Sequence, residues 1–225
     1  MKAELIDSMG TDLTVVNAAR VSFDKESDWL DLGFAEGTSG HSLPSKDVGL
    51  IKYLANHNHW TPFSHVMIQM RETVPIFVAR QRFKHMVGFT YNEVSRRYVD
   101  NEPEFYIPDV WRKASENKKQ GSGDTHPDSD RYYNKYLDLI DHVSKLYNEM
   151  ISEGVAPEQA RMVLPQSMYT SYYVTGSLAA WARAYKLRID PHAQKEIQDL
   201  AKQWDNIISN IPELRYSWNA LTSKS

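Results

Sequence analysis

The segment RQRFKHMVGFTYNEVSRRY, residues 80–98, concentrates positive charge in a chain whose formal net charge is −3. Its ionisable groups are Arg80, Arg82, Lys84, His85, Arg96 and Arg97, with Glu93 as the acid among them. Arginine binds phosphate through two parallel hydrogen bonds, and a hydroxyl such as that of Ser95 satisfies a remaining oxygen. The segment therefore predicts an anion site, and the alternative is an ordinary solvated surface.

Two later segments place single cations where an anionic partner is expected. Arg161 lies in ARMVLP, an otherwise apolar helical segment in which an unpaired guanidinium would be costly to bury. Arg188 precedes DPHAQKEI, where Asp190 or Pro191 begins a helix and His192 lies in its first turn. Helix N-termini attract anions. The partner of Arg161 is either a substrate or a carboxylate of the protein itself, and the alternative to an anion site at Arg188 is a capped surface helix.

The segment HNHWTPFSH, residues 57–65, carries three histidines. H-x-H pairs occur in zinc sites, but no carboxylate lies within the segment, so packing histidines are favoured and we predict no metal. Thr61 and Pro62 predict a turn that offers backbone amides and a hydroxyl to a ligand.

The composition describes a chain of 225 residues that buries a core without a disulfide or a metal. We expect a single domain spanning residues 1–225. Cysteine is absent, which agrees with a reducing cytoplasm and excludes a thiol nucleophile, a disulfide redox pair and a cysteine-ligated cluster.

Some partners and folds are excluded by what the sequence lacks. The near-neutral charge argues against a nucleic-acid partner, and no apolar run is long enough to span a membrane. Neither GxGxxG nor GxxxxGK[ST] occurs, so neither a Rossmann loop nor a P-loop holds a nucleotide.

Periodicity and turn residues predict an α+β fold, with a small antiparallel or mixed sheet and a largely helical C-terminal half. Strands are expected over 65–74 and 104–111, and loops over 24–47 and 114–130. Helices are expected over 11–23, with Thr11 or Asp12 as N-cap, and over 46–57, 130–153, 156–163, 177–187, 191–209 and 212–222.

A further helix is expected from Pro75, with an apolar stripe of Ile76, Ala79, Phe83 and Met86 and with Gly88 after its end. Gln81 and His85, four residues apart, share its other side.

Read in order, several segments resemble the signatures of the flavin-dependent thymidylate synthases, the ThyX family. They are AARVSF (18–23), HNHWTPFSH (57–65), FVARQRFKH (77–85) with YNEVSRRY (91–98), ARMVLP (160–165) and LRIDPHAQKEI (187–197). The resemblance covers most of the chain. The absence of cysteine agrees with it, because the unrelated thymidylate synthases need a thiol.

The resemblance implies the reductive methylation of dUMP to dTMP. Methylenetetrahydrofolate donates the carbon, and NADPH donates electrons through FAD, which is tightly or loosely bound. It also implies a homotetramer with FAD and dUMP between subunits. The opening segment would then face the dUMP phosphate and the FAD pyrophosphate.

Site residues follow from the same resemblance. Arg188 matches the arginine that stabilises negative charge on the uracil ring, so it is the expected catalytic residue. Residues expected to bind dUMP are Gln81, Arg82, Phe83, Lys84, Glu93, Val94, Ser95, Arg96, Arg97, Arg161 and Arg188. Residues expected to bind FAD are Thr61, Lys84, His85, Met86, Glu93, Ser177, Leu178, Ala179, Arg183 and His192.

The sequence departs from the family pattern in the flavin half. Lys84-His85-Met86 replaces Arg-His-Arg, Ser177-Leu178-Ala179 replaces Asn-x-Arg, and Ser64 replaces a glutamate. The alternative to the methyltransferase is therefore a nucleotide-binding homologue with impaired flavin chemistry.

Overall fold

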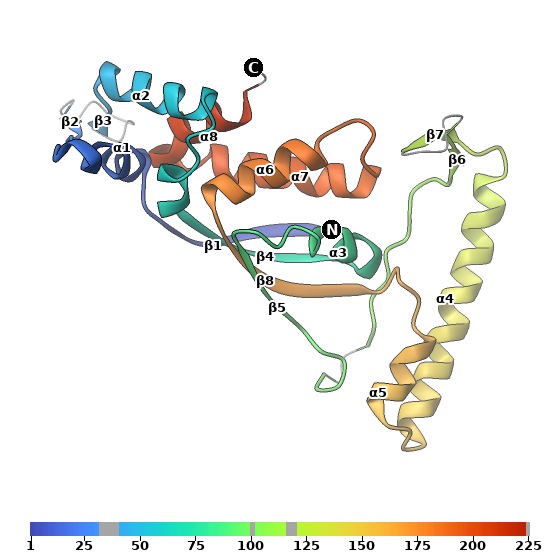
Figure 1. The fold of residues 1–225 in the computed structure, drawn as a ribbon. Helices are drawn as coiled ribbons and strands as arrows, with labels where there is room; N and C mark the ends of the chain where they lie inside the picture. Colours follow the sequence, from blue (N-terminus) through green and yellow to red (C-terminus); the bar gives the residue numbers. More distant parts are fainter. Residues whose placement is uncertain (32–40, 100–101, 116–120, 224–225) are drawn as a thin grey trace.

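The computed structural model describes residues 1–31, 41–99, 102–115 and 121–223. At its centre lies a four-stranded antiparallel sheet with the strand order β1-β4-β8-β5 (Figure 1). Its strands are β1 (Lys2–Met9), β4 (Met67–Pro75), β5 (Phe89–Glu93) and β8 (Tyr169–Ser177). Two short pairs lie outside it: β2 (Leu30–Asp31) with β3 (His41–Ser42), and β6 (Arg112–Ala114) with β7 (Ser122–Thr125).

Helices cover one face of this sheet (Figure 1). That layer comprises α1 (Asp12–Arg20), α2 (Ser45–Asn56), α6 (Leu178–Arg188), α7 (Lys195–Ser209) and α8 (Arg215–Thr222). The short α3 (Ile76–Arg82) follows β4 directly, while α4 (Ser129–Ser152) and α5 (Pro157–Ala160) form an arm beyond the sheet. Single 3-10 turns are η1 (Val21–Phe23), η2 (Pro62–His65), η3 (Arg161–Val163) and η4 (Pro212–Leu214). The expected α+β class is confirmed.

Strand β4 shows why the sheet has one covered and one open face. Ile68, Met70 and Val74 are buried against the helices, while Gln69 and Arg71 point the other way. The expected strand over 65–74 is therefore confirmed. Within the described residues, no helix has the length and apolar character needed to cross a bilayer.

The helix expected over 75–86 is shorter than its apolar pattern indicated. It ends at Arg82, and Met86 is 73% exposed, so Met86 does not belong to the buried stripe. Gly88 has φ +80° and forms the turn into β5 instead of closing the helix. Tyr91 contacts the turn that follows the helix, since its hydroxyl lies 3.3 Å from the Arg82 carbonyl oxygen and 2.6 Å from that of His85.

Several strands had no expectation from the sequence. Strand β8 alternates buried Thr170, Tyr172 and Val174 with outward-facing polar residues, and its hydroxyl-rich composition hides the period. The strand expected over 104–111 is reduced to one bridge between Phe105 and Met168. The two expected loops contain β2, β3 and β7, and their residues 32–40 and 116–120 lie outside the described residues.

A buried ion pair lies between the sheet and the helical layer. Glu72 of β4 and Arg82 of α3 are fully buried, and Arg82 Nε lies 3.2 Å from Glu72 Oε2. The Tyr172 hydroxyl also donates to this carboxylate. The guanidinium carbon lies 4.4 to 4.8 Å from the ring centres of Phe89, Trp204 and Trp181, as expected for cation–π contacts.

Removing one partner of this pair leaves the other charge buried and unpaired. Arg82→Met or Glu72→Leu should each lower the free energy of unfolding by about 3–5 kcal/mol. The double variant should recover about half of that loss, because no charge is left unpaired. Urea unfolding measures all three variants. A double variant less stable than either single one would contradict this account of the pair.

Candidate active site

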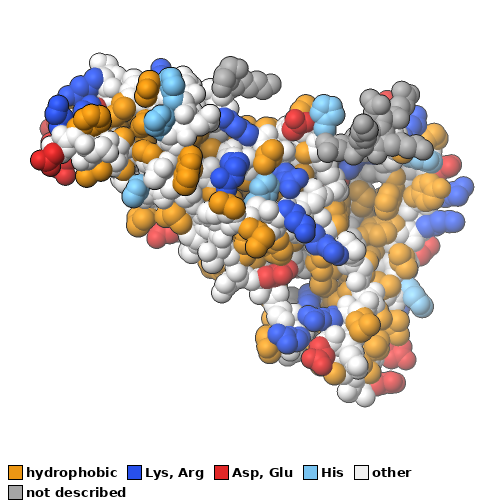
Figure 2. Space-filling model, viewed as in Figure 1, with side chains coloured by type: hydrophobic (Ala, Val, Ile, Leu, Met, Phe, Trp, Pro, Cys, Tyr) orange, Lys and Arg blue, Asp and Glu red, His pale blue; other side chains and the backbone are white. Residues whose placement is uncertain are grey.

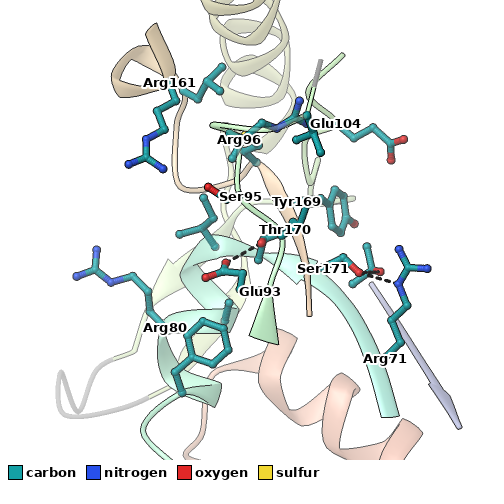
Figure 3. A pocket seen from close by; sticks show the side chains of 18 of the residues that line it. Arg71, Arg80, Glu93, Ser95, Arg96, Glu104, Arg161, Tyr169, Thr170 and Ser171 are labelled. Carbon is teal, nitrogen blue, oxygen red and sulfur yellow. Dashed lines mark hydrogen bonds between the residues drawn. The ribbon is translucent and has the colours of Figure 1, made fainter. Parts of the chain in front are cut away.

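A cavity of about 860 Å³ lies on the open side of the sheet, where β4, β5 and β8 meet the arm (Figure 3). Four arginines from different elements line it: Arg71 of β4, Arg80 of α3, Arg96 after β5, and Arg161 of η3. The carboxylates in its lining are Glu93 and Glu104. Positive charge thus exceeds negative charge around the cavity, which suits an anionic ligand.

Short hydrogen bonds fix the polar groups in this cavity (Figure 3). Thr170 Oγ1 donates to Glu93 Oε1 at 2.6 Å, and Arg71 Nε donates to Ser171 Oγ at 3.0 Å. Ser95 Oγ accepts from the Arg97 backbone amide at 3.4 Å. The cavity therefore presents cations, hydroxyls and one oriented carboxylate, a donor and acceptor set suited to a sugar phosphate.

A second cluster surrounds Arg188, the last residue of α6. Its Nε donates to His85 Nε2 at 2.8 Å, and its Nη2 donates to the Gln81 carbonyl oxygen at 3.1 Å. Because an arginine only donates, the His85 ring must accept at Nε2 and carry its proton at Nδ1. Both partners are uncharged, so the positive charge of Arg188 stays available to a ligand.

The electrostatics of this cluster hold His85 neutral. Burial, followed by the positive charges of Arg188, Arg82 and Arg183, lowers the pKa of His85 to about 4. Burial also lowers the pKa of Arg188, with Arg82 contributing. At neutral pH the imidazole is therefore a hydrogen-bond acceptor and not a second cation.

Two adjoining cavities open beside this cluster. One, of about 600 Å³, is lined by Gln81, Arg188, His192 and Gln194 among others. The other, of about 560 Å³, has mainly apolar lining residues, namely Leu54, Ala55, Trp60, Phe63, Ala179, Ala182, Leu187 and Leu221, with Asn58, Arg183 and Lys186. Lys186 and Leu187 line both. An apolar slot with an arginine therefore continues along α6 into a polar pocket.

A chain of side-chain hydrogen bonds fixes Gln81 in the polar pocket. Its amide donates to the Gln194 side chain, and Gln194 Nε2 donates to Glu196 Oε2 at 2.8 Å. Glu196 pairs with Arg112 of β6 at 2.6 Å. Gln194 is thus a site residue that the sequence analysis missed, and its position at the N-cap of α7 was the available signal.

The structure divides the expected dUMP residues between two places. Phe83, Glu93, Val94, Ser95, Arg96 and Arg161 line the arginine-rich cavity, whereas Gln81 and Arg188 line the polar pocket. No residue lines both cavities in the described part of the chain. Arg97 and Lys84 are exposed and line neither cavity, although Arg97 Nε lies 3.5 Å from Ser95 Oγ. Arg71, Arg80 and Ser171 were missed, although the period of β4 places Arg71 on the open face.

The expectation that Arg82 contacts dUMP does not match its position. The side chain is fully buried in the ion pair with Glu72 and among aromatic rings, so it cannot meet a ligand in the cavity. The sequence could not show this, because charge alone places an arginine on the surface.

The expected FAD residues are also divided. Ala179 and Arg183 line the apolar cavity, and His85 and His192 belong to the Arg188 cluster and the polar pocket. Thr61 and Met86 are exposed, whereas Ser177 caps α6 and Leu178 lies in the core. His192 lies before α7 and not in its first turn, because Asp190 accepts the His192 backbone N–H at 2.8 Å.

The three histidines of residues 57–65 are exposed in this structure. His57 stacks on Tyr53 at 4.1 Å and its Nδ1 lies 2.9 Å from the Tyr53 carbonyl oxygen. Across the described ranges, no group of three histidine or acidic side chains is arranged to hold a metal ion.

On the face drawn in Figure 2, Lys and Arg side chains gather across the middle of the molecule, between the helical layer and the arm. Comparisons with known proteins identify the family of this chain. Residues 4–212 match the family model Thy1, described as thymidylate synthase complementing protein.

Relatives and solved structures extend this match over nearly the whole chain. A flavin-dependent thymidylate synthase of Thermosipho africanus is 42% identical over 207 residues, covering 90% of this chain and 83% of the relative. One of Thermus thermophilus is 36% identical, covering 95% and 73%. The structure of a UMP/dUMP methylase, PolB from Streptomyces cacaoi bound with 5-Br dUMP, superposes with a TM-score of 0.81 at 28% identity, covering 98% and 94%.

The fold and these matches define the class of protein: an α+β enzyme of the Thy1 type. The chain belongs to the family of flavin-dependent thymidylate synthases.

Replacing Arg188 should change the titration of His85. Since Arg188 is the foremost charged group that lowers this pKa, Arg188→Ala should move it from about 4 toward 6.5. Proton NMR follows the imidazole signal, which His85→Gln identifies by its disappearance. Arg161→Ala, in the other cavity, is the matched control and should leave the titration unchanged. An unchanged pKa in Arg188→Ala would contradict the pairing.

The lowered pKa of His85 also has a stability consequence. The unfolded chain binds a proton at His85 near pH 6.5 and the folded chain only near 4, so unfolding is favoured as pH falls through this window. The stability that comes from the neutral state of His85 is fully present above pH 6.5 and is lost as the pH falls toward 4. His85→Gln should remove this part of the pH dependence in urea unfolding.

Proposed function

We propose that this chain catalyses the reductive methylation of dUMP to dTMP, with methylenetetrahydrofolate as carbon donor and NADPH as reductant through FAD. The observation that carries the proposal is the Arg188 cluster in a chain of this family. A half-buried guanidinium there donates to a neutral imidazole and to a carbonyl oxygen.

Arg188 is the proposed catalytic residue. The uracil C5 atom becomes nucleophilic only when negative charge on the ring is stabilised, and a fixed guanidinium provides that stabilisation without a covalent adduct. The chain has no cysteine to form such an adduct. An uncharged partner such as His85 matters here, because a carboxylate in its place would neutralise the Arg188 guanidinium.

The arginine-rich cavity is the proposed site of the dUMP phosphate and sugar. Arg161 and Arg80 would bind phosphate oxygens, Ser95 would donate to another, and Glu93 would accept from a sugar hydroxyl. Thr170 supports this role of Glu93 by holding one of its oxygens at 2.6 Å. Gln81, fixed through Gln194, would bind the base beside Arg188.

The surface along α6 fits a flavin nucleotide by its chemistry. An apolar slot with Arg183 suits an aromatic ring system next to an anion, and the polar pocket continues from it. When bound, FAD supplies the electrons that reduce the transferred carbon. Ala179, Arg183, His85 and His192 would hold it, with Thr61, Lys84 and Met86 at the exposed edge and Ser177 and Leu178 acting through the backbone.

The alternative, a nucleotide-binding homologue with impaired flavin chemistry, keeps one supporting observation. Met86 is 73% exposed, and a thioether there cannot replace a cation. Arg183 offers compensation, because its Nη2 donates to the carbonyl oxygen of Val87, beside Met86.

The homotetramer belongs to the same proposal, with each protomer forming one domain of residues 1–225. Among the described residues of one chain, the arginine-rich cavity and the polar pocket share no lining residue. A complete site would then combine Arg161 of one subunit with Arg188 of another.

Formation of dTMP tests the activity directly. Purified protein receives dUMP, methylenetetrahydrofolate, NADPH and excess FAD without oxygen, and chromatography separates the nucleotides. We expect dTMP from the wild type that disappears without FAD, and a fall of at least about a hundredfold in Arg188→Ala with the fold intact. Bound but unconverted dUMP in the wild type would favour the binding homologue. Full activity of Arg188→Ala would remove this residue from the mechanism.

Subunit mixing tests whether sites form between chains. Arg161→Ala and Arg188→Ala proteins are each assayed alone, then unfolded together in equal amounts and refolded. If the two arginines come from different subunits, about one quarter of the sites carry both, and a corresponding fraction of activity returns. No recovery would place both arginines in one subunit. Wild-type protein refolded with itself controls for losses during refolding.

A further inference from the structure

Tyr91 of β5 connects the buried ion pair to the Arg188 cluster. Its hydroxyl oxygen lies 2.6 Å from Arg82 Nη1 and 2.6 Å from the carbonyl oxygen of His85. The ring of His85 in turn accepts a hydrogen bond at Nε2 from Arg188 Nε, 2.8 Å away. A continuous path of contacts therefore leads from the core to the proposed catalytic arginine.

The direction of each hydrogen bond along this path is fixed. Arg82 only donates, so the Tyr91 oxygen accepts from it, and the single Tyr91 proton is left for a carbonyl oxygen. The His85 carbonyl at 2.6 Å is closer than the Arg82 carbonyl at 3.3 Å. Burial raises the pKa of Tyr91 to about 12, so this phenol keeps its proton. Arg82 itself is held by Glu72, which also accepts from Tyr172.

The segment held by Tyr91 is a turn between α3 and β5. In it the His85 amide donates to the Arg82 carbonyl at 3.1 Å, and the Phe89 amide donates to the Met86 carbonyl at 3.1 Å. The Tyr91 hydroxyl adds a bond from a rigid strand to the carbonyl of the residue that bears the imidazole. Loss of that bond frees the peptide that follows His85 and, with it, the ring orientation.

We propose that Tyr91 is a positioning residue, which holds the His85 ring as the acceptor of the Arg188 Nε–H through a hydrogen bond to the His85 carbonyl. The buried Glu72–Arg82 pair fixes the direction of the Tyr91 proton. The expected effect of Tyr91 on turnover rests on the proposed function of Arg188, whereas its effect on the orientation of the His85 ring does not.

The burial of Arg82 agrees with a role beyond packing. A buried ion pair is often no more stabilising than apolar side chains of the same size. Within the described residues, Arg82 Nη2 is buried without a hydrogen-bond partner, which adds to the cost. What Arg82 supplies that an apolar side chain cannot is a donor to the Tyr91 oxygen.

The variant Tyr91→Phe tests the proposal, since it removes one oxygen and keeps the ring packed against Phe83 and Phe89. Tyr136→Phe is the matched control, because Tyr136 also donates its hydroxyl to a backbone carbonyl, that of Tyr106, at 3.0 Å on the arm. Long-range proton–nitrogen NMR of the free protein at pH 7 reports which imidazole nitrogen carries the proton. His85→Gln identifies the signals of His85.

In the wild type and in Tyr136→Phe we expect His85 to carry its proton at Nδ1 alone. In Tyr91→Phe we expect a mixture of Nδ1–H and Nε2–H forms, because the acceptor role toward Arg188 no longer selects one. In turnover, kcat should fall about five- to tenfold, as expected for one lost hydrogen bond, while KM for dUMP changes less than about twofold.

Two results would overturn the proposal. One is an unchanged His85 signal or an unchanged kcat in Tyr91→Phe, and the other is an equal change in Tyr136→Phe, which would indicate general loosening. The NMR experiment needs no turnover. If the wild type makes no dTMP, the proposed function fails while the ring signal still decides the role of Tyr91.

Discussion

A buried guanidinium needs an anion beside it and acceptors for its N–H groups. The centre of this molecule supplies an anion and a hydroxyl acceptor to Arg82. Arg82 receives the Glu72 carboxylate from β4, the Tyr91 hydroxyl from β5, and aromatic faces from Phe89, Trp181 and Trp204. These groups come from the sheet and from α6 and α7 of the helical layer. The relative positions of β4, α3, β5, α6 and α7 are therefore tied to one charge.

The same charge acts on the proposed active site through space. Burial lowers the pKa of His85 most, and the charges of Arg188, Arg82 and Arg183 lower it further, so the imidazole stays neutral beside the charged Arg188. A protonated histidine would repel Arg188, and a carboxylate would neutralise it. In the proposed mechanism, the first change would displace Arg188, and the second would weaken its stabilisation of negative charge on the uracil ring.

Although the net charge of the chain is mildly negative, cationic side chains gather at two separate cavities. Arg71, Arg80, Arg96 and Arg161 converge from four elements onto the open face of the sheet. Arg188 instead lies at the end of α6, in a pocket that shares none of its described lining residues with the first. The residues proposed to bind dUMP are thus divided between two places in one chain, as expected if protomers combine to form a site.

The sequence by itself determined the family, the α+β class, most helices and the residue types of the site, because ordered motifs and apolar periods are local properties. It determined that Arg161 and Arg188 would be functional candidates, and that no thiol takes part. Strand β8 was missed because its alternating tyrosines and hydroxyl residues have little hydrophobic contrast. Only the tertiary structure decided which cations are ligand-facing: Arg82 is in the core and Arg80 lines a cavity, although they are two residues apart. A side chain's partners come from distant segments, and a sequence motif does not specify those contacts.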